Sequence, residues 1–180
     1  MRRQDSLNFP SWTEAPLALL RRDGHCGLLA AWAVLKHFRK RTSSAQLVKD
    51  TAYSSTQGVL TIGIAHALAE AGLRVRFYTD IDPDRKPLER RLYRMAERRG
   101  AVILPAVDVS TLLATVRTGS IPIVFYNVID GCGHFSPLLG IQKRRLVLPH
   151  DDHGGMSLAQ FDRVWITPET CRQAVVADAS

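Results

Sequence analysis

Apolar positions at helical spacing dominate the first half of this chain, and they predict a series of helices. The spacing is maintained over residues 26–39, which predicts a buried helix there. Ser43 and Ser44 are N-cap candidates for a second helix. Thr61 is the N-cap candidate for a third helix, which Gly72 closes.

The period of the pattern changes after the third helix, and strands begin to alternate with helices. The predicted elements are a half-buried strand over residues 73–78, a basic helix from Leu88 to Gly100, a short strand over 102–104 and a helix over 109–118 with Ser110 as its cap.

The last third of the chain is predicted to be mostly strands. Strands are expected over residues 121–128, 134–141, 146–148 and 164–166, with a hairpin tip at 143–145 and a short capped helix over 157–161. Helices first and strands last is an α+β order, with N-terminal helices packed on a C-terminal antiparallel sheet.

Length and composition predict one globular domain. The chain has 180 residues and 46% of them are hydrophobic, which is enough to bury a sizeable core. No repeat, low-complexity tract or linker divides it, so we expect a single domain over residues 1–180. Residues 1–22 are expected to be an irregular lead-in, and residues 167–180 a tail.

The charge narrows the classes of partner only slightly. The formal net charge is +7, with arginine-rich clusters at residues 36–41, 90–99 and 143–145. Such clusters can meet nucleic acid or an acidic partner, but no aromatic interleaving or nucleic-acid motif accompanies them. We therefore favour a solvated basic surface over nucleic-acid binding.

The sequence also predicts a location. No run approaches the roughly 18 apolar residues of a membrane span, and no apolar run follows the N-terminus as in a signal peptide. Three cysteines are an odd number, which argues against a disulfide framework. We expect a reducing cytoplasm, although export without a cleaved signal is compatible with the same features.

One cysteine stands at the start of the predicted first helix. The turn signal Asp23-Gly24 leads through His25 into Cys26 and Gly27. Unpaired N–H groups and the positive end of the helix dipole favour a thiolate there, which predicts an acidic, nucleophilic thiol. An ordinary buried cysteine is the alternative.

A cysteine nucleophile needs a base, and the base needs an acceptor that orients it. His134 opens a predicted strand after a glycine-rich turn, and an antiparallel return of the following length brings Asp151 or its neighbours back to the same edge. Cys132 and Cys171 are expected to be bystanders. No cofactor is predicted.

The cluster His150, Asp151, Asp152 and His153 could in principle hold a metal ion, with Cys132 and His134 nearby. Zinc sites need about four ligands in fixed geometry, and no CxxC or HExxH spacing supports one here. We therefore predict no metal site.

Three segments together resemble the papain-like cysteine peptidases of the bacteriocin double-glycine leader-processing type and their stand-alone relatives. The first is GHCGLLA at residues 24–30; the second is GSIPIV at 119–124 with GHFSPLLGI at 133–141; the third runs from LVL at 146–148 through Asp151 to SLAQF at 157–161 and Trp165. The resemblance covers about residues 20–166. It implies a bacterial thiol protease of papain-like fold.

The resemblance implies a catalytic triad of Cys26 as nucleophile, His134 as base and then acid, and Asp151 as the orienting group. One departure concerns the oxyanion hole, because Leu20 stands where the family has a glutamine, and Gln4 is too far upstream. Loss of one oxyanion donor typically costs about 2.7–4 kcal/mol.

Alternatives remain for the donors of the oxyanion hole and for the third residue of the triad. The N–H of Cys26 can serve as one oxyanion donor, and Arg21 or Arg22 is a candidate for the other. The family's Asp-Pro is also altered, since Pro149 precedes His150-Asp151, which leaves His150 or Asp152 as alternatives to Asp151.

The favoured function is a cysteine peptidase or related acyl-transfer hydrolase, in which Cys26 attacks a carbonyl of a peptide or protein substrate. A catalytically degenerate peptide-binding domain is one alternative, motivated by the missing glutamine. A secreted effector or toxin that acts on a host target is another, motivated by the basic surface.

Overall fold

The computed structural model describes residues 9–128, 132–150 and 155–179. The helical elements are η1 (Trp12–Glu14), α1 (Leu17–Leu20), α2 (Cys26–His37), α3 (Ser44–Asp50), α4 (Thr61–Glu70), α5 (Pro87–Arg98), α6 (Val109–Arg117) and α7 (Leu158–Trp165). The strands are β1 (Arg74–Thr79), β2 (Val102–Pro105), β3 (Ile121–Asn127), β4 (Gly133–Pro137), β5 (Ile141–Gln142), β6 (Arg145–Leu146) and β7 (Ala174–Asp178).

A five-stranded sheet in the order β2-β1-β7-β3-β4 forms the middle of the fold. The β1–β2 pair is parallel and the other pairs are antiparallel. Val175 of β7 pairs with Phe77 of β1 on one side and with Ile123 of β3 on the other. β7 therefore joins the two halves of the sheet, while β5 and β6 form a separate two-stranded ribbon.

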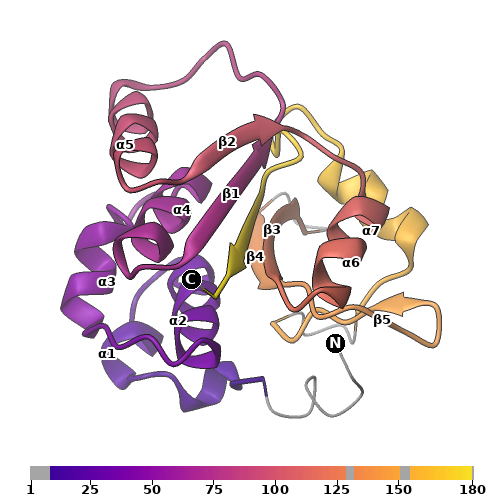
Figure 1. The fold of residues 1–180 in the computed structure, drawn as a ribbon, viewed down its shortest axis with the longest axis horizontal. Helices are drawn as coiled ribbons and strands as arrows, with labels where there is room; N and C mark the ends of the chain where they lie inside the picture. The colour runs from indigo at the N-terminus through magenta and orange to yellow at the C-terminus, as the bar shows by residue number, and fades with distance from the viewer. Residues whose placement is uncertain (1–8, 129–131, 151–154, 180) are drawn as a thin grey trace.

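Helices cover both faces of this sheet (Figure 1), with α2, α3, α4 and α5 on one side and α6 and α7 on the other. Successive side chains of β7 contribute to the hydrophobic cores on both faces of the sheet. Val175 and Ala177 belong to the first hydrophobic cluster, and Ala174 and Val176 belong to the second. Period-2 alternation places successive side chains on opposite faces. The result is two cores separated by one sheet.

The structure confirms the α+β class and the antiparallel arrangement of the C-terminal strands. The predicted helices over residues 26–39, after Ser43 or Ser44 through Val48, and over 62–71 are present as α2, α3 and α4, and Ser43 accepts the Gln46 N–H as a cap. The sheet is larger than expected, because β1 and β2 extend it beyond the C-terminal strands.

Two predicted caps are wrong. Thr61 is the first residue of α4 rather than its cap, and its hydroxyl donates to Gln173. Asp108, not Ser110, caps α6 by accepting the Thr111 N–H at 2.7 Å. A carboxylate at the N-cap also meets the positive end of the helix dipole, which favours Asp108 in that position.

Two predictions near the C-terminus are also wrong. Residues 164–166 do not form a strand; α7 extends to Trp165 from a capping box of Ser157 and Gln160. Residues 174–178 lie in the expected tail, yet they form β7 in the middle of the sheet.

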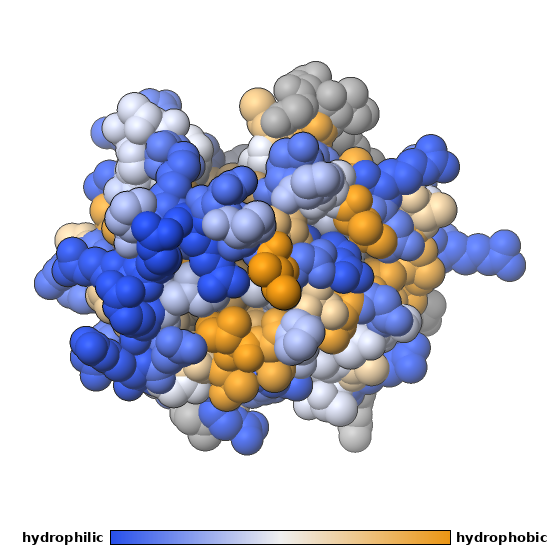
Figure 2. All heavy atoms as spheres, turned by 90° about the horizontal axis from the view of Figure 1, so that it is seen from above, coloured by the Kyte–Doolittle hydropathy of each residue, from blue (hydrophilic) through white to orange (hydrophobic). Residues whose placement is uncertain are grey.

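One face of the molecule shows how polar and apolar side chains are distributed on the surface. The face in Figure 2 shows hydrophilic side chains around smaller hydrophobic patches. In the part of the chain that the structure describes, no helix combines the length and the apolar character needed to cross a bilayer.

A substitution at Gly63 tests how closely α4 approaches the backbone at the end of α3. A Cβ on Gly63 would lie 2.3 Å from the backbone oxygen of Thr51. We expect Gly63→Ala to lower the free energy of unfolding by roughly 1–3 kcal/mol, because overpacking against backbone outweighs the gain in helix propensity. Urea unfolding measures this.

The milder comparison is Gly27→Ala, whose methyl would meet only side-chain atoms 3.1–3.3 Å away. Equal losses of stability for the two variants would contradict the backbone clash at Gly63.

Candidate active site

The turn that enters α2 is held from the segment between α3 and α4. Tyr53 donates its hydroxyl to the backbone oxygen of Asp23 at 2.7 Å. Gly24 and Gly58 have φ of 58° and 68°, and a Cβ on Gly24 would lie 3.3 Å from the Gly58 Cα. The left-handed backbone and the close approach both favour glycine, and together they fix where Cys26 begins the helix.

Gly27 brings α2 close to β4. A Cβ at this position would lie 3.1 Å from Phe135 and 3.2 Å from Val59. The first turn of α2 therefore lies directly beside the strand that carries His134. The backbone N–H of Phe135 acts to lower the pKa of the Cys26 thiol, so the thiol lies near that strand.

His134 packs against a neighbouring aromatic ring, and the glycine before it makes room for another. Gly133 leaves room for the Phe125 ring, whose atoms would lie 2.4 Å from a Cβ there. Tyr126, the register partner of His134, meets the imidazole edge-on with ring centroids 5.5 Å apart. The glycine before His134 is thus required by an aromatic ring rather than only by a turn.

The backbone of His150 orients the His134 ring. His134 Nε2 lies 2.8 Å from the His150 backbone oxygen. Because a carbonyl can only accept, Nε2 carries the hydrogen, and Nδ1 is left as the basic nitrogen. The His150 N–H in turn donates to Ser136 Oγ at 3.2 Å, and Ser136 donates to the Pro137 oxygen at 3.1 Å. Ser136 is fully buried, so this clamp is shielded from water.

The side chain of His150 is buried and lacks a hydrogen-bond partner among the described residues. Only 7% of the residue is exposed, and neither ring nitrogen has a hydrogen-bond partner among the described residues. Burial, with a smaller contribution from His134, lowers the pKa of His150 to about 4. The imidazole is therefore neutral at physiological pH.

These groups surround one small cavity of about 110 Å³. Its lining combines one thiol, three imidazoles and two apolar side chains: Trp12, His25, Cys26, Leu29, His134 and His150. Trp12 comes from η1, in the segment expected to be an irregular lead-in. Cys26 and His134, the predicted nucleophile and base, therefore line the same cavity.

The expected acidic thiol is not found. Burial raises the pKa of Cys26, and hydrogen bonds from the N–H groups of Phe135, Gly27 and Cys26 itself offset this only in part. The helix start contributes as predicted, but desolvation of the half-buried thiol outweighs it. In the resting structure the sulfur is a protonated thiol at neutral pH.

The other residues that the sequence suggested for the site are not found in the cavity lining among the described residues. Leu20 packs against the main core and offers no donor. Arg22 donates to the Ala18 oxygen, and its guanidinium lies 5.2 Å from the centre of the Tyr53 ring. The structure thus gives Arg22 other partners than the cavity. Asp151 lies outside the described residues.

Asp152 and His153 also lie outside the described residues. Among the residues that the structure does describe, no group of His, Cys, Asp or Glu side chains is arranged to hold a metal ion. Cys132 is exposed, and Cys171 has φ of 47° and donates its thiol to the Pro168 oxygen. All three cysteines of the chain are free.

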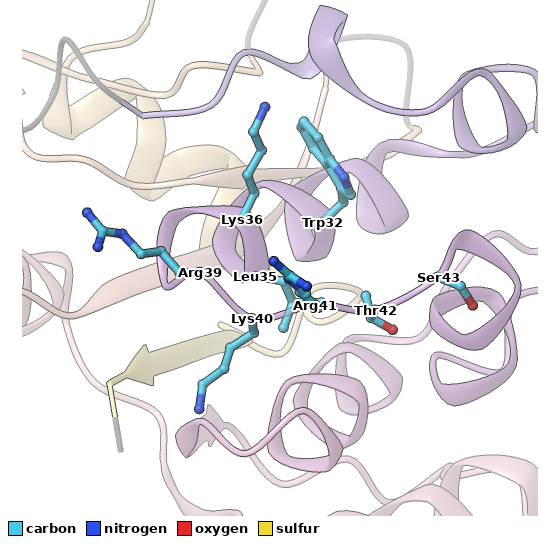
Figure 3. Close-up of a pocket in the computed structure, with 8 residues that line it drawn as sticks. All are labelled: Trp32, Leu35, Lys36, Arg39, Lys40, Arg41, Thr42 and Ser43. Carbon is cyan, nitrogen blue, oxygen red and sulfur yellow. The ribbon is translucent and has the colours of Figure 1, made fainter.

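A second, larger hollow of about 570 Å³ lies at the other end of α2 (Figure 3). It is lined by Trp32, Leu35, Lys36, Arg39, Lys40, Arg41, Thr42 and Ser43. Lys36 pairs with Glu14 at 2.6 Å. This hollow is basic but its lining contains no thiol, carboxylate or imidazole, so the candidate active site is the smaller cavity at Cys26.

The structure adds residues that sequence analysis missed. His25, Trp12 and Leu29 line the cavity, and Ser136 and Gly133 position its walls. His25 Nδ1 lies 2.5 Å from the Arg22 backbone oxygen, and no sequence motif predicts this contact. Only Gly133 carried a signal, since it stands directly before the predicted base.

Comparison with solved structures identifies the fold. The peptidase domain of Streptococcus ComA, described as a bi-functional ABC transporter involved in a quorum-sensing pathway, matches with a TM-score of 0.56 and 19% identity, over 86% of this chain and 91% of that one. A double-glycine motif protease from an AMS/PCAT transporter, solved in complex with the leader peptide, matches with a TM-score of 0.56 and 15% identity, over 91% of each chain.

The chain thus has the papain-like fold of double-glycine peptidase domains, and the resemblance seen in the sequence is confirmed at the level of the fold. No protein-family model matches the chain, and no curated relative matches it significantly.

The buried ring of His150 predicts a pH-dependent stability. Its pKa falls from 6.5 to about 4 on folding, so the unfolded chain binds more protons between these values and stability decreases as pH falls through that window. The loss attributable to His150 is on the order of 3 kcal/mol.

Urea unfolding of the parent and of His150→Gln from pH 7 to pH 4 measures this effect. The variant, which cannot titrate at this position, should lose less stability over the window. Parallel curves for the two proteins would contradict the neutral buried imidazole.

Proposed function

We propose that this chain is a cysteine peptidase, or a related acyl-transfer enzyme, that acts on a peptide or protein substrate. The observation that carries the proposal is the shared cavity of Cys26 and His134 in a double-glycine peptidase fold. A nucleophile and a base on adjacent rigid elements form the arrangement that nucleophilic catalysis requires.

In the proposed first step, the Cys26 sulfur attacks the substrate carbonyl carbon while its proton passes to His134 Nδ1. A C–S bond forms, and the carbonyl π electrons move to the oxygen. The tetrahedral intermediate then collapses, the C–N bond breaks, and the His134 proton goes to the leaving amine. Water or an amine releases the acyl group in the second step, with His134 again as base.

Transfer of the thiol proton to His134 during the attack is consistent with the raised pKa of Cys26. A thiol that is protonated at rest needs a base within the cavity at the moment of attack, and His134 Nδ1 is free for this because Nε2 is committed to the His150 carbonyl. A neutral carbonyl stabilises the resulting imidazolium less than a carboxylate does. Asp151, which directly follows His150 in the chain, stays the proposed acidic member of the triad.

We place the enzyme in a reducing cytoplasm, because all three cysteines are free and disulfides persist mainly in oxidising compartments. One structural neighbour is a double-glycine motif protease in complex with the leader peptide, so a double-glycine peptide is the first substrate class to test. A peptide-binding domain without turnover is the alternative, favoured by Leu20 and by the raised pKa of the thiol.

The proposal is tested with N-acetyl-Gly-Gly p-nitrophenyl ester on a Cys132→Ser/Cys171→Ser background, which leaves Cys26 as the only thiol. We expect stoichiometric p-nitrophenolate release, with the acyl group found on Cys26 by peptide mass spectrometry. Cys26→Ala should abolish the burst. His134→Ala should slow acylation by roughly 10²–10⁴-fold, the usual contribution of a general base.

Circular dichroism of each variant controls for folding. Unchanged acylation in His134→Ala, or an unmodified Cys26 in the parent, would reject the enzyme in favour of the binding domain.

Asp151→Asn tests the third member with the same ester. We expect slower acylation, because the carboxylate charge that stabilises the imidazolium is lost. The effect should be smaller than that of His134→Ala, because His134 Nε2 retains the main-chain acceptor at His150. Asp84→Asn, on the distant β1–α5 connection, is the matched control. A loss in Asp151→Asn as large as that in His134→Ala would contradict the role of the carbonyl.

A further inference from the structure

The imidazole of His150 is a buried polar group that the mechanism above does not use. Its backbone holds His134, but its ring has no hydrogen-bond partner among the described residues and the residue is only 7% exposed. Buried polar groups are satisfied in most proteins, and a catalytic role is one explanation for an exception in a candidate active site. His150 lines the same cavity as Cys26.

The proposed reaction also needs a second hydrogen-bond donor for the oxyanion, which the residues assigned so far do not supply. A tetrahedral intermediate carries a negative oxygen, which needs hydrogen-bond donors fixed in advance. The N–H of Cys26 at the start of α2 supplies one donor. The family's second donor is a glutamine amide, and Leu20 occupies that position here with an apolar side chain packed on the core.

We infer that the side chain of His150 supplies this second donor, so that its ring N–H binds the oxyanion formed when Cys26 attacks the substrate. This inference rests on the proposed function. Two of the three histidines that line the cavity thus have separate roles: His134 moves the proton, and His150 stabilises charge without exchanging a proton.

The chemistry of a neutral imidazole suits this role. One ring nitrogen carries a hydrogen and the other does not, so the ring can donate without being a cation. Burial and the neighbouring His134 keep the pKa of His150 at about 4, which preserves that form across the neutral range. A neutral histidine also polarises a carbonyl in triosephosphate isomerase. In a site with little water, such a donor is stronger than in solution.

The ring is not required to orient His134. That contact uses the His150 backbone oxygen, and the His150 N–H is held by Ser136. Both contacts use backbone atoms, so any residue at position 150 can make them, except that proline has no N–H to donate to Ser136. Substitution of the side chain therefore separates oxyanion binding from the positioning of the base.

The test compares two reactions of Cys26 on the Cys132→Ser/Cys171→Ser background. Acylation by N-acetyl-Gly-Gly p-nitrophenyl ester passes through an oxyanion. Alkylation by iodoacetamide is a direct displacement of iodide by sulfur and forms none. The variants are His150→Ala, His150→Phe, which keeps a ring but no donor, and His150→Gln, which restores a neutral donor.

We expect His150→Ala and His150→Phe to slow acylation by about 10²–10³-fold, the effect of losing one oxyanion donor. Alkylation should remain near the parental rate in both, and His150→Gln should recover part of the acylation rate. His66→Gln is the control, because His66 is also buried, but its Nδ1 is bonded to the Asp50 oxygen at 2.7 Å.

Equal losses in acylation and alkylation would overturn the inference, because the ring would then support the thiol or the fold instead. Undiminished acylation in His150→Ala or His150→Phe would overturn it as well. Failure of the proposed function looks different: Cys26 would then resist acylation in the parent, or acylate independently of His134. Thermal unfolding of each variant identifies any protein that has not folded.

Discussion

The contact between the first turn of α2 and β4 is the constraint on which the candidate site depends. Gly27 allows it, since any side chain there would press on Phe135 and Val59. Because the helix lies this close, the sulfur of Cys26 lies near the backbone N–H of Phe135, and His134 stands one residue away on the same strand. The thiol and the base come from residues far apart in sequence, so only this packing makes them neighbours.

Low polarity is the second property of the site, and it governs the charge state of the groups there. Burial raises the pKa of Cys26 and lowers that of His150, so both resting groups are neutral. The acceptor on His134 that the structure describes is a main-chain carbonyl. In the proposed mechanism, such a site holds little charge before the reaction, and its donors stabilise the charge that develops during it.

The sequence predicted those features whose signals are local. Helical spacing indicated α2, and the glycine before His134 marked the start of β4. β7 escaped prediction because its short apolar run at 174–178 has meaning only through pairing with β1 and β3. The run at 164–166 looked like a strand because it is β-branched and aromatic, yet the capping box at Ser157 set a helix through most of it. The carbonyl of His150 could not be predicted, since a backbone acceptor leaves no trace in residue type.

The position of β7 also has a consequence for the order in which the protein assembles during synthesis. The helix that carries Cys26 leaves the ribosome early, but β7 is the last described element of the chain and separates β1 from β3 in the sheet. Until it emerges, β1–β2 and β3–β4 are two ribbons with unpaired inner edges. The nascent chain therefore contains its thiol long before it contains a closed sheet, and the sheet beside the candidate cavity closes only when β7 has paired with β1 and β3.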